Sequence, residues 1–430
     1  MEAVPGCRLT RKELYIKKMD LEKLALEAEE NLKDIFADID RTAYQNTARV
    51  IDSFREHRVD ESCFAGTSGY GHDDKGRDTL DAIYADVFGA ESAFVRHSIS
   101  NGTHAITIAL YGLLRPNDVM LAITGKPYDT LEQVVGINGE PGNGSLADFG
   151  VEYSQVDLVD GKVNWEEADR RLKEFGDRVK VVFIQRSKGY LDRPTLTVDQ
   201  IGEIIKFVKA RSKAYVVVDN CYGEFTETKE PTAVGADIIV GSLIKNPGGG
   251  MAECGGYVAG TKRAVELASY RLTSVGEGLD GGATLGMNKG LIKGFFYAPH
   301  TVAQALKTMH FAAYIFEKLG CEVAPRWNER RADIIQTIKL GTPEALVNFC
   351  KGIQAGSPVD AYVSPEPYPI PGYADDVIMA AGTFTQGASI ELSADGPMRA
   401  PYTAFMQGGL TYESGKYGIL SAAARYLGKH

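Results

Sequence analysis

The residue of this sequence that most clearly suggests chemistry is a lysine at the end of an apolar segment. Residues 236–250, ADIIVGSLIKNPGGG, carry an apolar segment into Lys245 and continue with Asn-Pro and three glycines. A partly buried lysine has its amine pKa lowered by lost hydration, which makes the amine a nucleophile toward carbonyl groups. The glycines behind it would let the backbone come close to a ligand. A solvent-exposed lysine would show the same pattern, so Lys245 alone decides nothing.

Two further polar side chains stand at the ends of apolar segments. Ser242 precedes the lysine in S-x-x-K, and its hydroxyl could donate to a phosphate oxygen. Asp219 ends AYVVVDN, and a carboxylate there could hold a proton on a pyridine nitrogen, which makes the ring an electron sink. A capping serine and a turn aspartate are the structural alternatives.

A helix start and a tyrosine complete the set. SNGTHAITIAL places Gly102 and Thr103 where free backbone N–H groups and the helix dipole favour a phosphate. Tyr128, in ITGKPYDTLEQ, could stack on an aromatic ring. A simple helix cap and a surface tyrosine give the same residue types. Because all five features follow strand-like segments, together they indicate pyridoxal 5'-phosphate (PLP) held covalently by Lys245.

The elements that must position these residues form a repeating α/β pattern. Apolar strands alternate with helices at residues 104–114, 164–175 and 199–212, which predicts a mostly parallel seven-stranded sheet covered on both faces. Such sheets bind ligands beyond the carboxyl ends of their strands. The predicted strands are SAFVRH, DVMLAIT, VEYSQVDLV, VKVVFIQ, AYVVVDN, ADIIVGSLI and GGYVAGT.

The two ends of the chain have different patterns. Apolar residues at helical spacing predict one helix over about residues 11–38 and a second over about residues 42–56. A long helical region follows at about residues 283–320, and Pro299 should break or kink it. The predicted segments are an N-terminal helical part (1–58), a large PLP-binding domain (59–298) and a small C-terminal α+β domain (299–430), with CEVAP, DIIQTIKL, DVIMAAGTF and SIELSA as its strands.

Composition narrows the class of protein. A net charge of −10 argues against nucleic-acid and anionic-membrane partners, which need a basic surface. The six cysteines are scattered without metal or disulfide spacing, and the seven histidines include no H-x-x-x-H pair, so we expect no metal. No apolar run is long enough for a membrane helix, and we expect a cytoplasmic protein.

The sequence resembles the Cys/Met-metabolism PLP enzymes of the aspartate-aminotransferase fold, type I. Within them it is similar to the bacterial family of aluminium-resistance cystathionine β-lyases, also called methionine γ-lyase family proteins. The resemblance covers about residue 60 to the C-terminus and is carried by TSGYGHDDKGRDTL, SISNGTHAI, VVVDNCYGEFTE, SLIKNPGGGMAECGGYVAG and QGASIELSADGPMRAPY.

The resemblance implies a role for each candidate. Lys245 matches the Schiff-base lysine, Asp219 the pyridinium partner, Ser242 a phosphate ligand, and Tyr128 the ring-stacking tyrosine. Gly102 and Thr103 match the phosphate site at the helix start.

Other implied roles depend on positions that vary from the family pattern. Tyr70 matches a tyrosine that reaches the phosphate of a neighbouring subunit, which implies a homo-oligomer with shared active sites, expected as a dimer of dimers. An arginine usually stands where this chain has His72, and Arg77 is one candidate to replace its charge. Arg399 is the candidate clamp for the substrate carboxylate. One of Gln185, Arg186 and Ser187 is expected to contact the cofactor's ring substituents.

The expected function is carbon–sulfur bond cleavage on a sulfur-containing amino acid. Lys245 would remove the Cα proton, Tyr128 would serve as general acid, and the products would be a thiol, pyruvate and ammonia. Methionine γ-lyase, aminotransferase or aldolase activity would use the same cofactor site. A non-catalytic PLP-binding protein is the alternative from another class.

Overall fold

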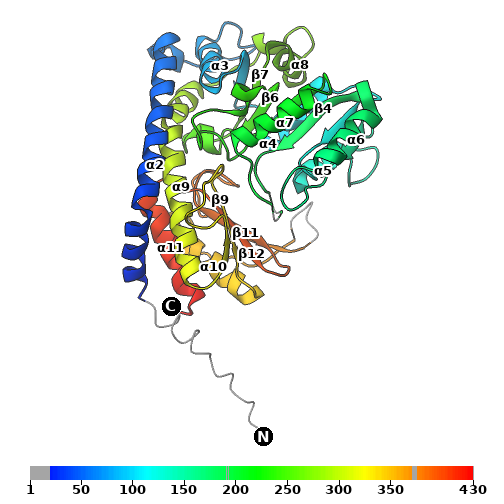
Figure 1. Ribbon diagram of the computed structural model, residues 1–430. Coiled ribbons are helices and arrows are strands. Elements are labelled where there is room, and N and C mark those ends of the chain that lie inside the picture. The colour runs from blue at the N-terminus through cyan, green and yellow to red at the C-terminus, as the bar shows by residue number, and fades with distance from the viewer. Residues whose placement is uncertain (1–19, 190, 192, 370–374, 430) are drawn as a thin grey trace.

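The structure of the protein is a computed structural model that describes residues 20–189, 191, 193–369 and 375–429. Its larger sheet has the order β1-β7-β6-β5-β4-β2-β3. Figure 1 labels β4, β6 and β7 of this sheet. All seven strands predicted from the sequence are present. They are β1 (Ser92–Arg96), β2 (Val119–Ala122), β3 (Glu152–Gln155), β4 (Val179–Gln185), β5 (Tyr215–Asp219), β6 (Ile238–Ser242) and β7 (Gly256–Gly260).

Strand direction brings the candidate residues to one edge of this sheet. The strands β2 to β6 pair in parallel, while β7 runs antiparallel to both of its neighbours, β1 and β6. Consequently β1 points the same way as β6. The segment after β1, which leads to Gly102, therefore lies at the same edge as Asp219 and Ser242, which end β5 and β6.

The sheet is apolar on both faces, because both are covered. On β5, Val217 packs into one hydrophobic cluster, and its neighbours Val216 and Val218 pack into another. Uninterrupted apolar strands are the expected consequence of such double coverage. The helices of this part are α3 (Lys75–Phe88), α4 (Gly102–Leu113), α5 (Asp129–Val135), α6 (Trp165–Phe175), α7 (Val198–Lys209) and α8 (Lys262–Leu272), with short 3-10 turns η1 (Glu61–Phe64), η2 (Gly176–Arg178), η3 (Pro231–Val234), η4 (Asn246–Gly248) and η5 (Gly278–Asp280).

A second, antiparallel sheet follows in the order β10-β11-β12-β9-β8. Two details differ from the sequence prediction: β12 was not predicted, and the strand expected at SIELSA, residues 389–394, begins later. In this sheet only alternate side chains enter the core, so the apolar signal is weaker. The elements are β8 (Glu322–Ala324), β9 (Ile335–Lys339), β10 (Val377–Ala380), β11 (Ser393–Pro397) and β12 (Thr403–Gln407), with α10 (Pro343–Ala355) and α11 (Tyr412–Tyr426).

Two long helices lie side by side along the molecule (Figure 1). The helix α2 (Leu21–Glu56) is continuous, so the two separate helices predicted over residues 11–38 and 42–56 are wrong where the structure describes them. No proline or glycine interrupts residues 38–42, so nothing breaks the helix there. Residues 11–19 of that prediction lie outside the described residues.

The second long helix, α9 (Asn288–Lys318), continues through Pro299, so the helix does not break there; the kink, the other expected outcome, stays a prediction. Pro299 forgoes one backbone hydrogen bond, but α9 packs against α2, α11 and η4 along its length. The predicted boundary at residue 298 falls inside this helix. Its residues up to Leu306 belong to one core cluster, and those from Met309 onward belong to another. The three predicted segment ranges remain a prediction.

Candidate active site

The side chain of Lys245 lies beyond the carboxyl end of β6, in the connection to η4. Its Nζ donates to the Ala388 carbonyl at 2.9 Å and contacts the Tyr222 hydroxyl. The same nitrogen stands 3.7 Å from the centre of the Tyr222 ring. The amine is therefore half-buried and held by two groups from distant parts of the chain.

The pKa of Lys245 differs from the sequence expectation. Burial acts to lower it, as expected, but Tyr222, Cys221 and Asp219 together outweigh burial, and the pKa is raised above its ordinary value. The expected depression is therefore wrong for the cofactor-free chain. The sequence argument considered burial alone and could not include a phenol and a carboxyl group that the fold brings close.

Asp219 is buried at the end of β5. Burial raises the pKa of its carboxyl group, while the Cys221 backbone N–H, Lys245 and Arg193 act in the opposite direction. The Cys221 N–H donates to Oδ1 at 3.1 Å. Because Asp219 and Lys245 each shift the pKa of the other, the two side chains are near neighbours at this edge.

A separate part of the site lies between Ser242 and the start of α4. The Ser242 hydroxyl is buried and has no hydrogen-bond partner among the described residues. A Cβ added to Gly102 would lie 3.0 Å from Cys221 Sγ and 3.6 Å from Ser242 Cβ, so only glycine leaves this space open. The first N–H groups of a helix have no acceptor within it. A buried hydroxyl and free helix N–H groups fit a phosphate.

Tyr128 connects the two parts. Its hydroxyl lies 2.7 Å from Thr103 Oγ1, and its backbone N–H donates to Gln185 Oε1 at 2.8 Å. Burial and the nearby Asp219 raise the pKa of its phenol, so the group is protonated at neutral pH. The structure thus brings Lys245, Asp219, Ser242, Gly102, Thr103 and Tyr128 together at one edge of the sheet.

The glycines after Lys245 allow close packing within the chain. A Cβ at Gly248 would lie 1.7 Å from the Leu243 carbonyl oxygen, and one at Gly249 would lie 2.2 Å from the Gly294 carbonyl oxygen of α9. Gly249 also has a φ of 55°, which favours glycine. Gly249 therefore lets η4 pack directly against α9, and Gly248 lets the chain fold back on Leu243. The expectation that these glycines make room for a ligand stays a prediction.

Tyr70 and its neighbours lie apart from the other candidates. The Tyr70 side chain is 79% exposed and stacks on His72, whose Nδ1 is 3.1 Å from the Asp280 carbonyl oxygen. Arg77 is buried and donates to the carbonyls of Gly71 and Gly282. Because its guanidinium holds these loops together, Arg77 does not fit the expected role as a phosphate partner within the chain.

The remaining candidates make contacts within the protein. Gln185 Nε2 donates to the Ser187 carbonyl at 3.0 Å, and Ser187 Oγ donates to Asp333 at 2.8 Å. Arg186 is fully buried in an ion pair with Glu227 at 2.9 Å. These three residues therefore contact parts of the protein that surround the site.

Arg399, the candidate carboxylate clamp, is 55% exposed and pairs with Asp375 at 3.1 Å. Its charge also acts to lower the pKa of Asp129, the residue after Tyr128. Arg399 is thus near the Tyr128 loop but is not among the side chains that meet at Lys245.

Two residues at the site were missed by sequence reasoning. Tyr222 adopts a left-handed backbone conformation, with φ of 71°, directly beside Lys245. Arg193 is buried, donates to the Ser187 carbonyl at 2.7 Å, and leaves Nε without a partner among the described residues. The signal for Tyr222 was present in VVVDNCYGEF, three residues after the strand-end aspartate.

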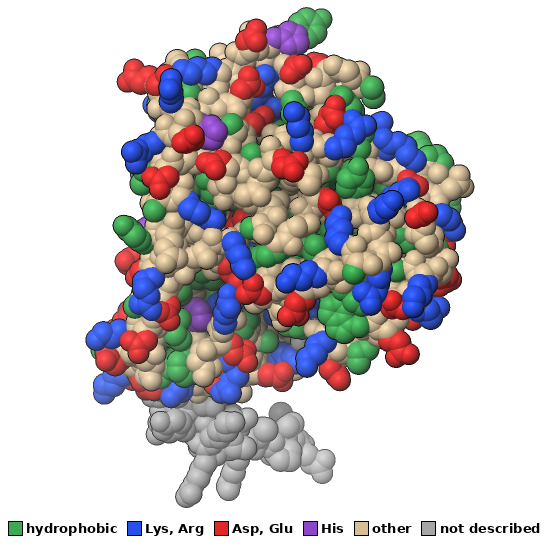
Figure 2. All heavy atoms as spheres, turned by 45° about the horizontal axis from the view of Figure 1, so that its top comes forward, with side chains coloured by type: hydrophobic (Ala, Val, Ile, Leu, Met, Phe, Trp, Pro, Cys, Tyr) green, Lys and Arg blue, Asp and Glu red, His purple; other side chains and the backbone are tan. Residues whose placement is uncertain are grey.

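The distribution of charged side chains and the length of the helices bear on metal and membrane sites. On the face shown in Figure 2, acidic and basic side chains are interspersed rather than gathered by sign. In the described part of the chain, no three histidine, cysteine or acidic side chains are grouped as metal ligands. The helices described here are also too short or too polar to cross a bilayer.

Comparison with known proteins shows which fold class and family this chain belongs to. The chain folds like the PLP-dependent Escherichia coli protein YhfS, with a TM-score of 0.60 at 17% identity, covering 89% of this chain and 95% of that protein. Its architecture is thus that of the type I PLP-dependent enzymes, as the resemblance implied. The profile of the methionine gamma-lyase family matches residues 21–427, and the chain belongs to that family.

Several relatives are much more similar. A Clostridium novyi protein named as a carbon–sulfur lyase involved in aluminium resistance is 48% identical, with a TM-score of 0.91 over 98% of this chain and 99% of its own. A Clostridium acetobutylicum protein, named as a candidate cystathionine beta-lyase involved in aluminium resistance, is 47% identical, with a TM-score of 0.92 over 96% and 98% of the two chains. The Bacillus subtilis protein YnbB is 51% identical over 95% of this chain and 97% of its own. PLP is the cofactor of this family and its structural neighbours, which confirms the expected cofactor at the level of the family.

Proposed function

We propose that this protein is a PLP-dependent carbon–sulfur lyase that cleaves a sulfur-containing amino acid. The observation that carries the proposal is that Lys245 and Asp219, which act on each other electrostatically, lie at the same sheet edge as Ser242, whose buried hydroxyl lacks a partner among the described residues. Family membership supplies the reaction class, since methionine gamma-lyase names the matching family.

The residues would hold the cofactor as follows. The N–H groups at the start of α4 and the Ser242 hydroxyl would bind its phosphate, and Asp219 would hold a proton on its ring nitrogen. Tyr128 would cover the ring. PLP would supply electron withdrawal at the Cα of an amino acid that has taken the place of Lys245 on it, which lowers the barrier to deprotonation and leaves the Lys245 amine free.

In the proposed reaction the protein moves two protons. The Lys245 amine takes the proton from Cα, and the Tyr222 hydroxyl and Ala388 carbonyl keep that amine in place. The protonated Tyr128 phenol donates to the sulfur as the carbon–sulfur bond breaks, so the sulfur leaves as a thiol. Addition of water to the remaining unsaturated amine then gives a 2-oxo acid and ammonia.

Substrate orientation is the role proposed for Arg399. Its guanidinium would exchange Asp375 for the substrate α-carboxylate, with which it can form two parallel hydrogen bonds. Support comes from its electrostatic influence on Asp129, beside Tyr128. The proposal also includes a homo-oligomer in which the exposed Tyr70 reaches the phosphate of a second subunit.

The experiment that tests the cofactor site is the visible spectrum of the purified protein, before and after borohydride reduction, followed by peptide mapping. We expect a yellow protein whose PLP is fixed on Lys245 after reduction. The Lys245→Ala variant should show no covalently fixed cofactor. A protein that stays colourless with added PLP would contradict the proposal.

Product analysis then tests the reaction. Cystathionine, cysteine and methionine are supplied one at a time without an amino acceptor, and thiol and 2-oxo acid are measured. A lyase releases both, whereas an aminotransferase needs an acceptor and an aldolase leaves the carbon–sulfur bond intact. A bound cofactor with no turnover of any of these substrates would favour a non-catalytic binding protein.

A further inference from the structure

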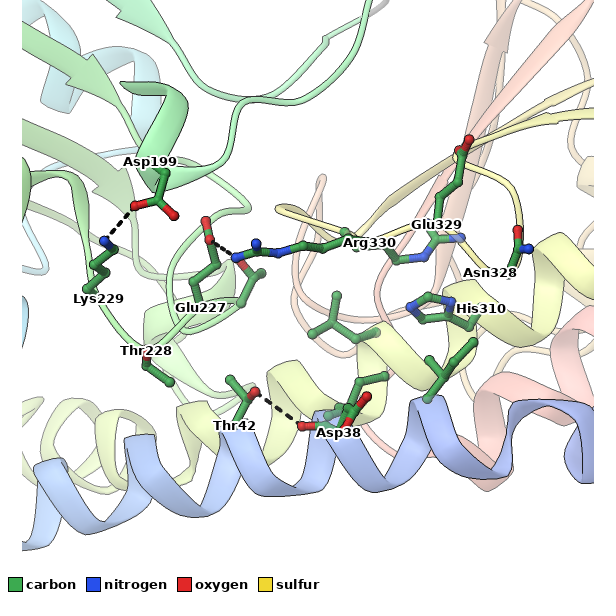
Figure 3. Close-up of a pocket in the computed structure, with 15 residues that line it drawn as sticks. Asp38, Thr42, Asp199, Glu227, Thr228, Lys229, His310, Asn328, Glu329 and Arg330 are labelled. Atoms are coloured by element: carbon green, nitrogen blue, oxygen red, sulfur yellow. Dashed lines mark hydrogen bonds and ion pairs between the residues drawn. The ribbon is translucent and has the colours of Figure 1, made fainter. Parts of the chain in front are cut away.

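A cavity of about 610 Å³ lies away from the proposed active site, where four segments meet (Figure 3). Its walls come from α2, from α9, from the loop at residues 226–229 and from the loop at residues 328–331, with Asp199 at the edge. It contains none of the residues proposed to hold the cofactor. Its volume is within the range of small-molecule sites.

A buried histidine presents a hydrogen-bond acceptor to this cavity. His310 Nδ1 is 2.6 Å from the Trp327 carbonyl oxygen, so Nδ1 carries the ring proton and donates it. Burial and the nearby Arg331 lower the pKa of His310 to about 3, which keeps the ring neutral. In the described part of the chain, nothing donates to Nε2. His310 is only 4% exposed and lines the cavity, so Nε2 can accept a hydrogen bond there from a ligand or from water.

An arginine supplies donors at another point of the cavity. Arg330 is 67% exposed, and one of its terminal nitrogens contacts Glu227 at 2.5 Å. Figure 3 shows its side chain extending across the cavity toward that carboxylate. A guanidinium has five N–H donors, and this contact uses one nitrogen, so the remaining donors can bind a carboxylate.

The rest of the lining is partly apolar and carries both signs of charge. Ile35 and Ile39 of α2 and Leu306 of α9 contribute aliphatic surface. The ionisable side chains of the lining, His310 apart, are four acids and three bases: Asp38, Asp199, Glu227 and Glu329 with Lys229, Arg330 and Arg331. A simple anion or cation would match one sign and oppose the other, whereas a zwitterion can match both.

We propose that this cavity is a second ligand site that binds an apolar α-amino acid. The carboxylate of the ligand pairs with Arg330, its ammonium group donates to His310 Nε2, and its side chain packs on Ile35, Ile39 and Leu306. The Asp38 carboxylate, also in the lining, already pairs with Arg41. The inference goes beyond the proposed reaction and does not depend on it, because the cavity and the cofactor site share no residue.

The test is calorimetric titration of the full-length protein with L-leucine, which has no sulfur and so is no substrate for carbon–sulfur cleavage. The titration is repeated with 4-methylpentanoate, which lacks the amine, and 3-methylbutylamine, which lacks the carboxylate. It is also repeated on Lys245→Ala, so that binding at the cofactor site is distinguished. Failure of the proposed lyase reaction would leave this measurement unaffected.

Two arginines of one loop provide a matched pair of variants. Arg330→Gln removes the proposed carboxylate partner, whereas Arg326→Gln removes an equally exposed arginine that pairs with Glu317 and does not line the cavity. Ile39→Trp fills the cavity without changing charge. Thermal unfolding of each variant verifies that it is folded.

We expect one leucine per chain in wild type and in Lys245→Ala, with binding about tenfold weaker in Arg330→Gln, unchanged in Arg326→Gln and lost in Ile39→Trp. Each single-charge analogue should also bind about tenfold more weakly. No binding at about 10 mM leucine would overturn the proposal. Equal effects of the two arginine variants, or loss of binding in Lys245→Ala, would also overturn it.

Discussion

At the scale of single residues, the site depends on the pairing of Lys245 with Tyr222. The lysine could be predicted from its place after an apolar strand, but the sign of its pKa shift could not. That sign depends on side chains from the end of β5, which approach only after the strands pair. Tyr222 follows the strand-end Asp219 by three residues, but its contact with Lys245 also forms only after the strands pair.

Tyr222→Phe removes a hydroxyl that raises the pKa of Lys245, so the pKa of the amine should fall in the cofactor-free protein. The measurement is the pH dependence of Lys245 acylation, followed by peptide mapping, and its midpoint should move to lower pH. Turnover should fall about tenfold because the amine is less well held. Tyr44→Phe, at an exposed tyrosine of α2, is the control. An unchanged midpoint would show that the Tyr222 hydroxyl does not raise the pKa of Lys245.

The buried carboxyl group of Glu224, near this pair, leads to a prediction about how stability depends on pH. Burial, with repulsion from Glu230, raises the pKa of Glu224 from 4.5 to about 8. The folded state therefore favours the protonated form, so this contribution is complete below pH 4.5 and is lost as pH rises toward 8. Each pH unit in that window costs up to about 1.4 kcal/mol.

Glu224→Gln should remove this loss, because glutamine stays neutral and still accepts from the Tyr257 hydroxyl, now at 2.9 Å from Glu224. Denaturant unfolding at pH 5 and pH 8 should show a smaller difference in the variant than in wild type. Glu253→Gln, at an exposed position, should keep the wild-type difference. An equal difference in unfolding free energy between pH 5 and pH 8 in wild type and both variants would show that Glu224 ionises normally.

At the scale of elements, prediction succeeded where one physical cause dominates. Strands buried on both faces are largely apolar, which made β2, β4, β5, β6 and β7 visible in the sequence. It failed where a contact partner decides, as for Pro299, which sits inside α9. Gly249 also belongs here, because only the folded chain shows that it lies against α9.

Two glycines one turn apart on α9 test that contact. A Cβ at Gly294 would lie 2.3 Å from the Gly248 carbonyl oxygen, whereas the nearest atom to a Cβ at Gly290 is at 3.6 Å. Gly294→Ala should lose about 2 kcal/mol of unfolding free energy through the clash. Gly290→Ala should be neutral or gain up to about 1 kcal/mol, because alanine favours helix. Similar melting temperatures for the two variants would contradict this packing.

At the scale of the whole molecule, the shared-site proposal predicts complementation between subunits. Lys245→Ala and Tyr70→Phe should each impair turnover, but a mixed dimer would contain one site with both residues intact. Random assembly of equal amounts should restore about a quarter of the wild-type sites. The measurement is activity after refolding the two variants together, with each variant refolded alone as control. No gain on mixing would place Tyr70 outside the neighbouring site.

The paired helices α2 and α9 also have a mechanical consequence. Each contributes to both major cores: α9 through Phe295 and Phe316, and α2 through Val50 and Leu32. The two helices are packed together and are linked by hydrogen bonds from Tyr314 and Lys318 of α9 to Glu27 of α2. A hinge movement of the second sheet relative to the first would require α2 and α9 to bend together. In the proposed lyase, substrate entry at Lys245 would therefore depend on the short loops around the site rather than on a domain movement.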